Sequence, residues 1–285
     1  MIIPSKPFTT EELQKKLRDI KQKSVQNATP EKMKLAFSCI DLTTLNSSDT
    51  ITHVSEFTWK VNEFVSAYPE MPNVGAICVY PNMVSTAKET LAAHNVNIAS
   101  VAGGFPSSMT FESIKVEEAR LAVEAGADEI DIVLPLWAFL EGNYDYCHNE
   151  IKAIKTAIGD THLKVILESG VLADPVKIWA ASIISLEAGA DFIKTSTGKM
   201  PVSATPEAAY IMCSALKWWN DANNQKRGFK PAGGIATPEE AMLYLTIVEE
   251  VLGEGWLNNK LFRIGASRLA NNLLSEIYKK EITFF

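Results

Sequence analysis

The feature that most constrains the fold of this chain is an alternation of short apolar runs with longer amphipathic stretches. Eight runs are strand candidates, at residues 35–40, 75–79, 98–101, 129–133, 163–167, 192–195, 228–230 and 261–264. Helical patterns lie between them, including residues 111–125, 144–158, 175–188, 206–218 and 238–251. Several of these patterns begin with proline, which suits the first turn of a helix. Strands that alternate with helices predict a parallel sheet covered by helices.

Eight such units without a linker-like break in composition predict a single (β/α)8 TIM barrel over residues 1–285. An open, doubly wound sheet is the alternative, but no G-x-G-x-x-G pattern follows the first strand. Thr9 and Glu12 form a capping-box pattern, and apolar residues follow at helical spacing. This predicts an extra N-terminal helix from Thr9 to about Gln26, within an N-terminal extension of residues 1–30.

The charge and cysteine content argue against several classes of function. The 285 residues carry a formal net charge of −7, and the pI is near 5.3. Nonspecific binding to nucleic acid or to an anionic membrane surface is therefore not expected. The cysteines contain no C-x-x-C pair, so reduced thiols are predicted at Cys39, Cys78, Cys147 and Cys213. No stretch resembles a signal peptide or a membrane span, and we expect a soluble, cytoplasmic protein.

The strand candidate at residues 192–195 carries a lysine, Lys194, among apolar neighbours. Burial removes the water that stabilises the ammonium form, so it lowers the pKa of a lysine. An amine that is uncharged near neutral pH is a nucleophile and forms imines with aldehydes and ketones. The alternative is a structural lysine whose ammonium group reaches the strand end or pairs with a carboxylate.

Two further strand candidates carry polar groups that fit the same chemistry. Lys230 ends the run 228–230, and two ammonium groups within a few ångström lower the pKa of at least one of them. Asp131 lies in the apolar run 129–133, where a buried carboxylate needs a partner such as one of these lysines. Because side chains alternate along a strand, Asp131, Lys194 and Lys230 converge if their sides face inward. No metal is expected, since no ligand spacing connects His53, His94, His148 and His162.

Three glycine-containing loops follow consecutive strand candidates and predict a phosphate site near the mouth of the barrel. In this fold, phosphate is commonly bound by the loops after strands seven and eight, through backbone N–H groups and a helix N-terminus. The residues concerned are Gly198, Lys199, Gly233, Gly234, Gly265 and Ser267. The alternative is that each glycine only permits a tight turn from strand to helix.

Six long segments occur in order along most of the chain. They are DLTTL from Asp41, ICVYP from Ile77, GADEIDIVLP from Gly126, GADFIKTSTGK from Gly189, GFKPAGG from Gly228 and LFRIGAS from Leu261. Together they resemble the deoxyribose-phosphate aldolases, a family of class I aldolases. The resemblance implies a (β/α)8 barrel without a cofactor. It also implies a small phosphorylated sugar as substrate, 2-deoxy-D-ribose 5-phosphate, cleaved reversibly to acetaldehyde and D-glyceraldehyde 3-phosphate.

The resemblance also implies a role for each of the three converging residues. Lys194 corresponds to the Schiff-base lysine, and Lys230 to the partner that lowers its pKa and relays protons. Asp131 corresponds to the acid and base that works with Lys230 through water.

Three more residues are candidates for the wall or floor of the substrate pocket. Cys78 is expected at the pocket wall, with a packing role. Asp41 and Thr43, at the end of the first strand, either hydrogen-bond substrate hydroxyls or cap the strand.

Three positions depart from the family pattern. Many members end in a mobile tail with a terminal tyrosine that assists proton transfer, whereas the tail here, residues 279–285, ends in Phe285. Ala236 stands where an arginine often follows the glycine pair, and Arg268 stands where a small residue often follows Ser267. Arg268 either supplies the charge missing at Ala236 or crowds the phosphate loop.

Two classes of function therefore stay open. The first is an active class I aldolase whose turnover is reduced because the tyrosine is absent. The second is an aldolase-like barrel with weak or no turnover that binds another protein. The sequence does not determine the oligomeric state, and it leaves a homo-oligomer open.

Overall fold

The structure, a computed structural model, describes residues 3–285 and contains one sheet of eight parallel strands. The strands are β1 (Ile40–Thr43), β2 (Ala76–Val79), β3 (Asn97–Val101), β4 (Glu129–Val133), β5 (His162–Ile166), β6 (Phe192–Lys194), β7 (Gly228–Lys230) and β8 (Ile264–Ala266). Their order is β7-β6-β5-β4-β3-β2-β1-β8. Isolated bridges from Phe229 to Phe262 and from Ala232 to Gly265 join the two ends. The sheet therefore closes, and the predicted barrel is confirmed.

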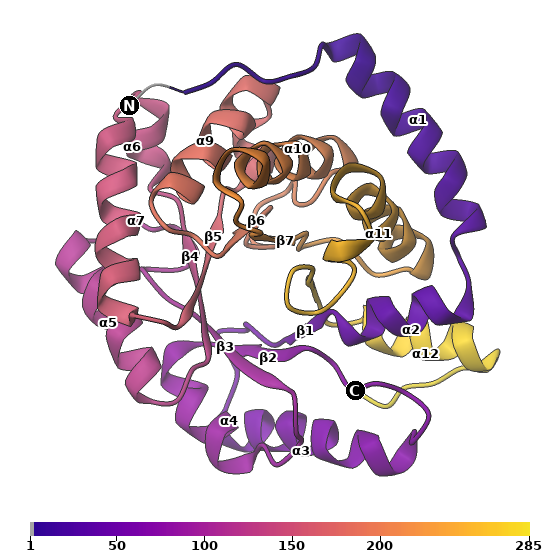
Figure 1. Ribbon diagram of the computed structural model, residues 1–285. Helices are drawn as coiled ribbons and strands as arrows, with labels where there is room; N and C mark the ends of the chain where they lie inside the picture. Colours follow the sequence, from indigo (N-terminus) through magenta and orange to yellow (C-terminus); the bar gives the residue numbers. More distant parts are fainter. Residues whose placement is uncertain (1–2) are drawn as a thin grey trace.

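Helices surround the strands (Figure 1). They are α1 (Thr10–Gln26), α2 (Pro30–Ser38), α3 (Ile51–Ala67), α4 (Val84–Thr90), α5 (Glu112–Glu124), α6 (Leu136–Leu140), α7 (Tyr144–Ile158), α8 (Ser169–Leu172), α9 (Pro175–Glu187), α10 (Pro206–Asn223), α11 (Pro238–Leu252) and α12 (Leu269–Tyr278), with 3-10 turns η1 (Pro81–Met83) and η2 (Glu254–Trp256). Four of them, α2, α9, α10 and α11, begin with proline after a threonine or aspartate that caps the helix. Each such cap stabilises a helix by about 1 kcal/mol.

The N-terminal region contains one helix that the sequence predicts and one that it does not. Helix α1 has the predicted capping box between Thr9 and Glu12, and it packs against α11. The prediction of the first strand at residues 35–40 is wrong in its bounds. Residues up to Ser38 belong to α2, and β1 begins at Ile40. The apolar residues of α2 are buried at helical spacing, and the Thr29 hydroxyl caps the helix by accepting the N–H of Lys32.

The eighth strand begins later than predicted, at Ile264 instead of Leu261. The N–H groups of Leu261 and Phe262 donate to the carbonyl of Asn258, at 3.2 and 2.9 Å, so they form a turn. The N–H of Arg263 donates to the carbonyl of Phe229 at 3.0 Å, and the N–H of Ile264, where β8 begins, donates to the carbonyl of Cys39 at 2.7 Å. Leu261 and Phe262 in this turn are as apolar as the strand that follows. Composition alone therefore does not show where the turn ends and β8 begins.

The strands divide the molecule into an apolar outer layer and a charged interior. Ile130, Ile132 and Ile193 face the helices and belong to the main hydrophobic core. Asp131 and Lys194 alternate with them and point to the opposite side, where they meet. Because a barrel of eight strands encloses only enough room for side chains, the groups on the inner side must pair with one another.

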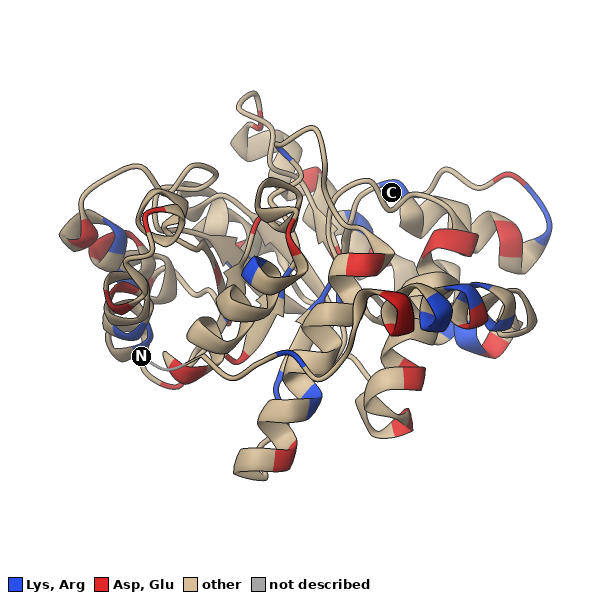
Figure 2. Cartoon of the chain, turned by 90° about the horizontal axis from the view of Figure 1, so that it is seen from above, with Lys and Arg blue, Asp and Glu red and all other residues tan. Residues whose placement is uncertain are grey.

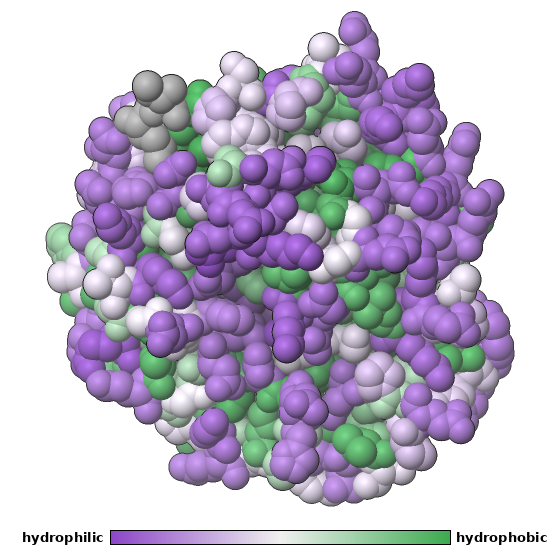
Figure 3. All heavy atoms as spheres, in the orientation of Figure 1, coloured by the Kyte–Doolittle hydropathy of each residue, from purple (hydrophilic) through white to green (hydrophobic). Residues whose placement is uncertain are grey.

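The outer surface is mostly polar. Acidic and basic positions are interspersed over the helices (Figure 2), and the face shown in Figure 3 is largely hydrophilic with scattered apolar side chains. Within residues 3–285, no helix combines the length and the apolarity needed to cross a membrane.

Candidate active site

The structure brings together the three residues that the strand alternation predicts to converge. The Nζ atoms of Lys194 and Lys230 each lie 2.8 Å from the same carboxylate oxygen, Oδ2 of Asp131. The two lysines are direct neighbours in the register of β6 and β7. Two ammonium groups that share one oxygen lie within about 6 Å of each other, where like charges lower each other's pKa.

These residues are part of a larger charged cluster inside the barrel. Asp41 and Glu129 both pair with Arg263, through Nη1 at 2.6 Å and Nη2 at 2.7 Å respectively. Lys164 lies 2.8 Å from Oδ1 of Asp131 and also pairs with Glu129, and Lys230 also pairs with Asp41. Carboxylates and cations therefore alternate around a closed ring, which we call the charge ring. Its members are Asp41, Lys230, Asp131, Lys164, Glu129 and Arg263.

The pKa values of the lysines shift in opposite directions. Burial lowers the pKa of Lys194, and the neighbouring Lys230 lowers it further, although Asp131 acts against both. Burial also disfavours the charged form of Lys230, but Asp131 and Asp41 outweigh it and raise the pKa of Lys230. The pKa of Lys164 is raised for the same reason, by Asp131 and Glu129 against the effect of burial. Lys194 is therefore the lysine of the cluster that gives up its proton most easily.

A cavity of about 490 Å³ opens above the cluster at the ends of the strands. Of the charge-ring residues and Lys194, only Lys194 lines it, and 4% of its surface is exposed. Lys230 and Asp131 lie below, fully buried. A molecule in this cavity can therefore reach the amine of Lys194 directly.

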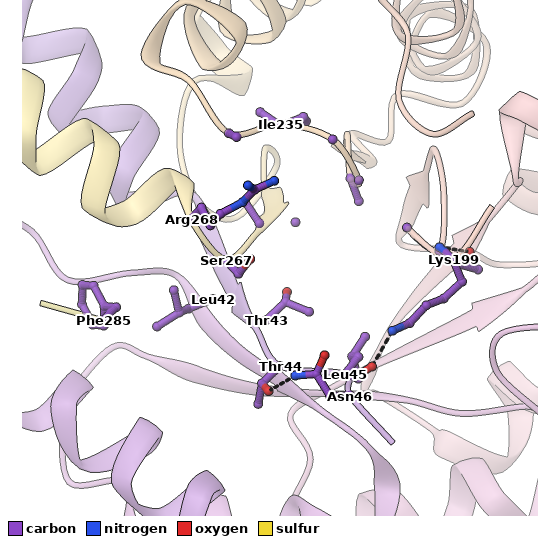
Figure 4. Close-up of a pocket in the computed structure, with 18 of the residues that line it drawn as sticks. Leu42, Thr43, Thr44, Leu45, Asn46, Lys199, Ile235, Ser267, Arg268 and Phe285 are labelled. Atoms are coloured by element: carbon purple, nitrogen blue, oxygen red, sulfur yellow. Dashed lines mark hydrogen bonds between the residues drawn. The ribbon is translucent and has the colours of Figure 1, made fainter. Parts of the chain in front are cut away.

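The predicted phosphate loops line the same cavity, and Figure 4 shows Lys199 and Ser267 on its wall. All six predicted residues line it: Gly198, Lys199, Gly233, Gly234, Gly265 and Ser267. Gly233 has a φ of +83°, and a Cβ there would lie 2.6 Å from Ser203, so no other residue fits without a shift. Ser267 precedes α12, whose first N–H groups have no partner within the helix and attract anions.

Two cations face this part of the cavity. The Nζ of Lys199 donates to the carbonyl of Leu45 at 2.5 Å, which places its charge between the loops after β1 and β6. Arg268 precedes α12 and is exposed, and among the described residues no carboxylate pairs with it. Ala236, the position without the expected arginine, also lines the cavity. Arg268 and Ala236 thus line the same cavity, where the arginine either supplies the missing charge or crowds the phosphate loop.

The other three predicted pocket residues have different positions. Thr43 lines the cavity, as expected. Asp41 is fully buried in the charge ring, where it pairs with Lys230 and Arg263, and it does not line the cavity. Cys78 is also fully buried, in a small apolar cluster with Ala99 and Val101 beneath the cavity wall, and burial raises the pKa of its thiol.

Sequence reasoning missed three charged residues of the site. Lys164, Glu129 and Arg263 have no role in the sequence-based prediction. The sequence does contain a sign of Lys164. This lysine interrupts the apolar residues of β5 in the way that Lys194 interrupts those of β6. Arg263 lies just before β8, and its pairing with Asp41 and Glu129 depends on the closure of the barrel.

The C-terminal residues pack beside the cavity. The amide of Asn271 in α12 accepts the N–H groups of Phe284 and Phe285 at 2.9 and 3.0 Å, and it donates to the carbonyl of Phe285. The ring of Phe285 packs against Phe64, with the ring centroids 5.3 Å apart, and lines the cavity.

A closed eight-stranded barrel with a buried lysine in the wall of a cavity that also carries cations is the arrangement expected of a barrel aldolase, a carbon–carbon lyase. A family model described as DeoC/LacD family aldolase matches residues 35–255. The chain belongs to this family.

Known relatives extend this result over most of the chain. The chain is 41% identical over 255 residues to the deoxyribose-phosphate aldolase of Mus musculus and 40% identical over 255 residues to that of Homo sapiens. Each match covers 85% of this chain and 80% of the relative. The solved deoxyribose phosphate aldolase of Aeropyrum pernix, described as a unique tetrameric structure, is 26% identical with a TM-score of 0.68. That match covers 93% of this chain and 99% of the other.

Proposed function

We propose that the protein is a class I aldolase that cleaves 2-deoxy-D-ribose 5-phosphate to acetaldehyde and D-glyceraldehyde 3-phosphate through a Schiff base on Lys194. The observation that carries the proposal is the position of Lys194, which lines the cavity while its amine lies 2.8 Å from Asp131. The mammalian relatives named deoxyribose-phosphate aldolase support the choice of substrate.

The first half of the reaction forms the imine. The uncharged amine of Lys194 attacks the C1 aldehyde of the open sugar and forms a carbinolamine, which loses water to give a protonated imine. A lowered pKa increases the fraction of Lys194 that is uncharged near neutral pH. The pKa of Lys230 is raised, so Lys230 stays charged. Its positive charge lowers the pKa of Lys194.

The second half breaks the carbon–carbon bond. Acetaldehyde contains C1 and C2, so the bond that breaks is C2–C3, and its electron pair moves to the imine nitrogen to form an enamine. The C3 hydroxyl loses its proton and becomes the aldehyde of glyceraldehyde 3-phosphate. The enamine then takes a proton at C2, and water releases acetaldehyde and the free lysine. Asp131, a carboxylate because its pKa is held well below the usual range, accepts and returns protons through water.

The phosphate group is assigned to the glycine loops and the N-terminus of α12. Gly233 and Gly234 offer backbone N–H groups, Ser267 lies at the N-terminus of α12, and Lys199 and Arg268 contribute charge. The anion is thereby kept away from the buried carboxylate of Asp131.

An assay of aldehyde release from 2-deoxy-D-ribose 5-phosphate tests the proposal, with Lys194→Met as the matched variant. We expect activity in the wild-type protein and a loss of about 10⁴-fold or more in the variant, since the nucleophile is removed. A folded wild-type protein that releases no aldehyde at high enzyme concentration would instead favour the binding-only barrel. Assembly into several copies stays a prediction, supported by the tetramer described for the Aeropyrum pernix relative.

A further inference from the structure

The charge ring contains charged residues that the proposed reaction does not touch. Lys164 and Glu129 are buried to within 1% of their surface and do not line the cavity. Arg263 is 4% exposed and connects Asp41 with Glu129 on the side of the barrel away from Lys194. Burying this many charges is costly unless they are fully paired. In the low-dielectric interior, each charge interacts strongly with its neighbours because little water screens it.

The charges of the cluster do not balance when every group is ionised. Asp41, Glu129 and Asp131 carry three negative charges, and the cations Lys164, Lys230, Arg263 and Lys194 carry four positive charges. The cluster then has one positive charge in excess. Loss of a single proton makes the buried cluster neutral, which is the favourable state where water is absent.

The geometry determines which cation loses that proton. Lys164 and Lys230 each contact two carboxylates, and Arg263 also contacts two. Lys194 contacts one carboxylate oxygen, which it shares with Lys230. Lys194 is therefore the least compensated cation of the four.

We propose that Lys164, Glu129 and Arg263 are positioning residues that set the proton state of Lys194 through the charge balance of the ring. Lys164 and Arg263 neutralise the carboxylates that would otherwise hold a proton on Lys194, and Glu129 holds these two cations in place. The inference rests on the proposed function, because it assigns a purpose to an uncharged Lys194.

Other titratable groups also face Lys194 from the surrounding elements. Asp131 and Lys230 contact it or share its partner, from β4 and β7. Cys78 on β2 acts on Lys194 through its charge only if its thiol ionises, and burial opposes this. Glu168, after β5, lies on the cavity side and accepts hydrogen bonds from Thr197. These groups are left unchanged in the experiment below, so that the ring alone varies.

Two single substitutions are expected to move the titration of Lys194 in opposite directions. Lys164→Met removes a positive charge, so the ring balances with Lys194 protonated, and the titration midpoint should rise by about one pH unit or more. Glu129→Gln removes a negative charge, leaves two positive charges in excess, and should lower the midpoint by a similar amount. The double variant removes the adjacent pair, restores the original excess and should return the midpoint close to that of the wild-type protein.

The midpoint is measured without substrate, from the pH dependence of Lys194 acetylation by acetic anhydride, followed by peptide mass spectrometry. Lys115→Met is the matched control, because Lys115 is equally buried and paired with Glu150 but lies outside the barrel interior. We expect this control to lower thermal stability and to leave the midpoint of Lys194 unchanged. Any ring variant must fold, as judged by its circular dichroism spectrum, before its midpoint is read.

Shifts of the same sign in both single variants, or no shift in either, would overturn the proposal. If neither single variant folds, the double variant decides, and a midpoint displaced by more than one pH unit from wild type would overturn it. The wild-type protein is also incubated with acetaldehyde and borohydride. If no imine is trapped there while the midpoints shift as expected, the proposed function fails and the charge balance stands.

Discussion

The interior of the barrel and the cavity at its mouth both hold several cations, but they hold them in different ways. Inside, Lys164 and Lys230 are fully buried, and each is paired with two carboxylates. At the mouth, the ammonium group of Lys199 donates to the backbone carbonyl of Leu45, and Arg268 faces solvent. Buried charges interact strongly, whereas exposed charges are screened by water and salt.

This difference separates two tasks. The interior charges have no route to a ligand, but they are strong enough to decide which lysine is protonated. The mouth charges are unpaired by carboxylates and reach the cavity, so they are suited to attract and hold an anion. Substitutions in the interior should therefore change the chemical step, and substitutions at the mouth should change binding.

After loss of Lys194 itself, the largest effect is expected for Lys230→Leu, which removes the cation that shares Oδ2 of Asp131 with Lys194. The pKa of Lys194 should rise, because the repulsion is lost while Asp131 remains as its partner. Activity at pH 7 should fall by about 10²- to 10³-fold, with partial recovery toward pH 9.5. The pH profile of kcat measures this effect. Near-normal activity at pH 7 would show that Lys230 has a purely structural role. It would contradict the assignment of the chemical step to the interior charges.

Acid should destabilise the protein through the carboxylates of the barrel interior, because these groups must be protonated at low pH. The cations of the ring hold the pKa of Asp131 well below its usual range, and the pKa of Glu129 is also lowered. A carboxyl group with a lowered pKa in the folded state stabilises the protein above its unfolded pKa, near 4, and this contribution is lost as pH falls below it. We expect the free energy of unfolding to fall progressively between about pH 5 and pH 2 as these carboxylates are protonated.

Urea unfolding at a series of pH values measures this loss. The variant Glu129→Gln should show a smaller dependence on pH in this range, because it contributes one titrating group fewer. A slope identical to that of the wild-type protein would contradict the lowered pKa of Glu129.

At the mouth, Ser267→Glu should weaken binding of the phosphorylated substrate. A carboxylate at the N-terminus of α12 repels the phosphate and should raise KM about 10- to 100-fold, with little change in kcat. Unphosphorylated 2-deoxyribose should be affected much less. Ser66→Glu, at an exposed position on α3, is the control for added negative charge. Equal losses on both substrates would indicate damage to the fold or the chemistry.

The smallest effect is expected for Arg268→Ala. An exposed and screened charge contributes little, so KM for the phosphorylated substrate should rise about 3- to 10-fold at low salt and less at 0.5 M salt. A fall in KM would show that Arg268 crowds the phosphate loop, which is the other reading that the sequence leaves open.

The sequence predicts which side of a strand faces the barrel interior, but it does not predict how many charged groups pair there. Alternation along β4, β6 and β7 is a local property, and it is sufficient to bring Asp131, Lys194 and Lys230 to one side. Pairing is not local: Arg263 and Glu129 are 134 positions apart in the chain. The closed ring therefore becomes visible only when the strand order and register are known.

The boundaries that were wrong have a similar cause. The apolar run 35–40 fits a buried strand and also the buried face of a helix, and the capping Thr29 ahead of Pro30 decides in favour of the helix. At the mouth, glycine pairs and a following helix identify the loops from sequence alone. The contact between Lys199 and the carbonyl of Leu45 depends on loops that are far apart in the chain, and it could not be predicted.

Borohydride reduction in the presence of acetaldehyde tests the central claim most directly, because acetaldehyde needs the interior amine and not the phosphate loops. Peptide mass spectrometry then identifies the modified lysine. The account predicts one adduct per chain, on Lys194, formed at neutral pH and absent in Lys194→Met. An unmodified Lys194, an adduct on Lys230, or adducts spread over the surface lysines would contradict it.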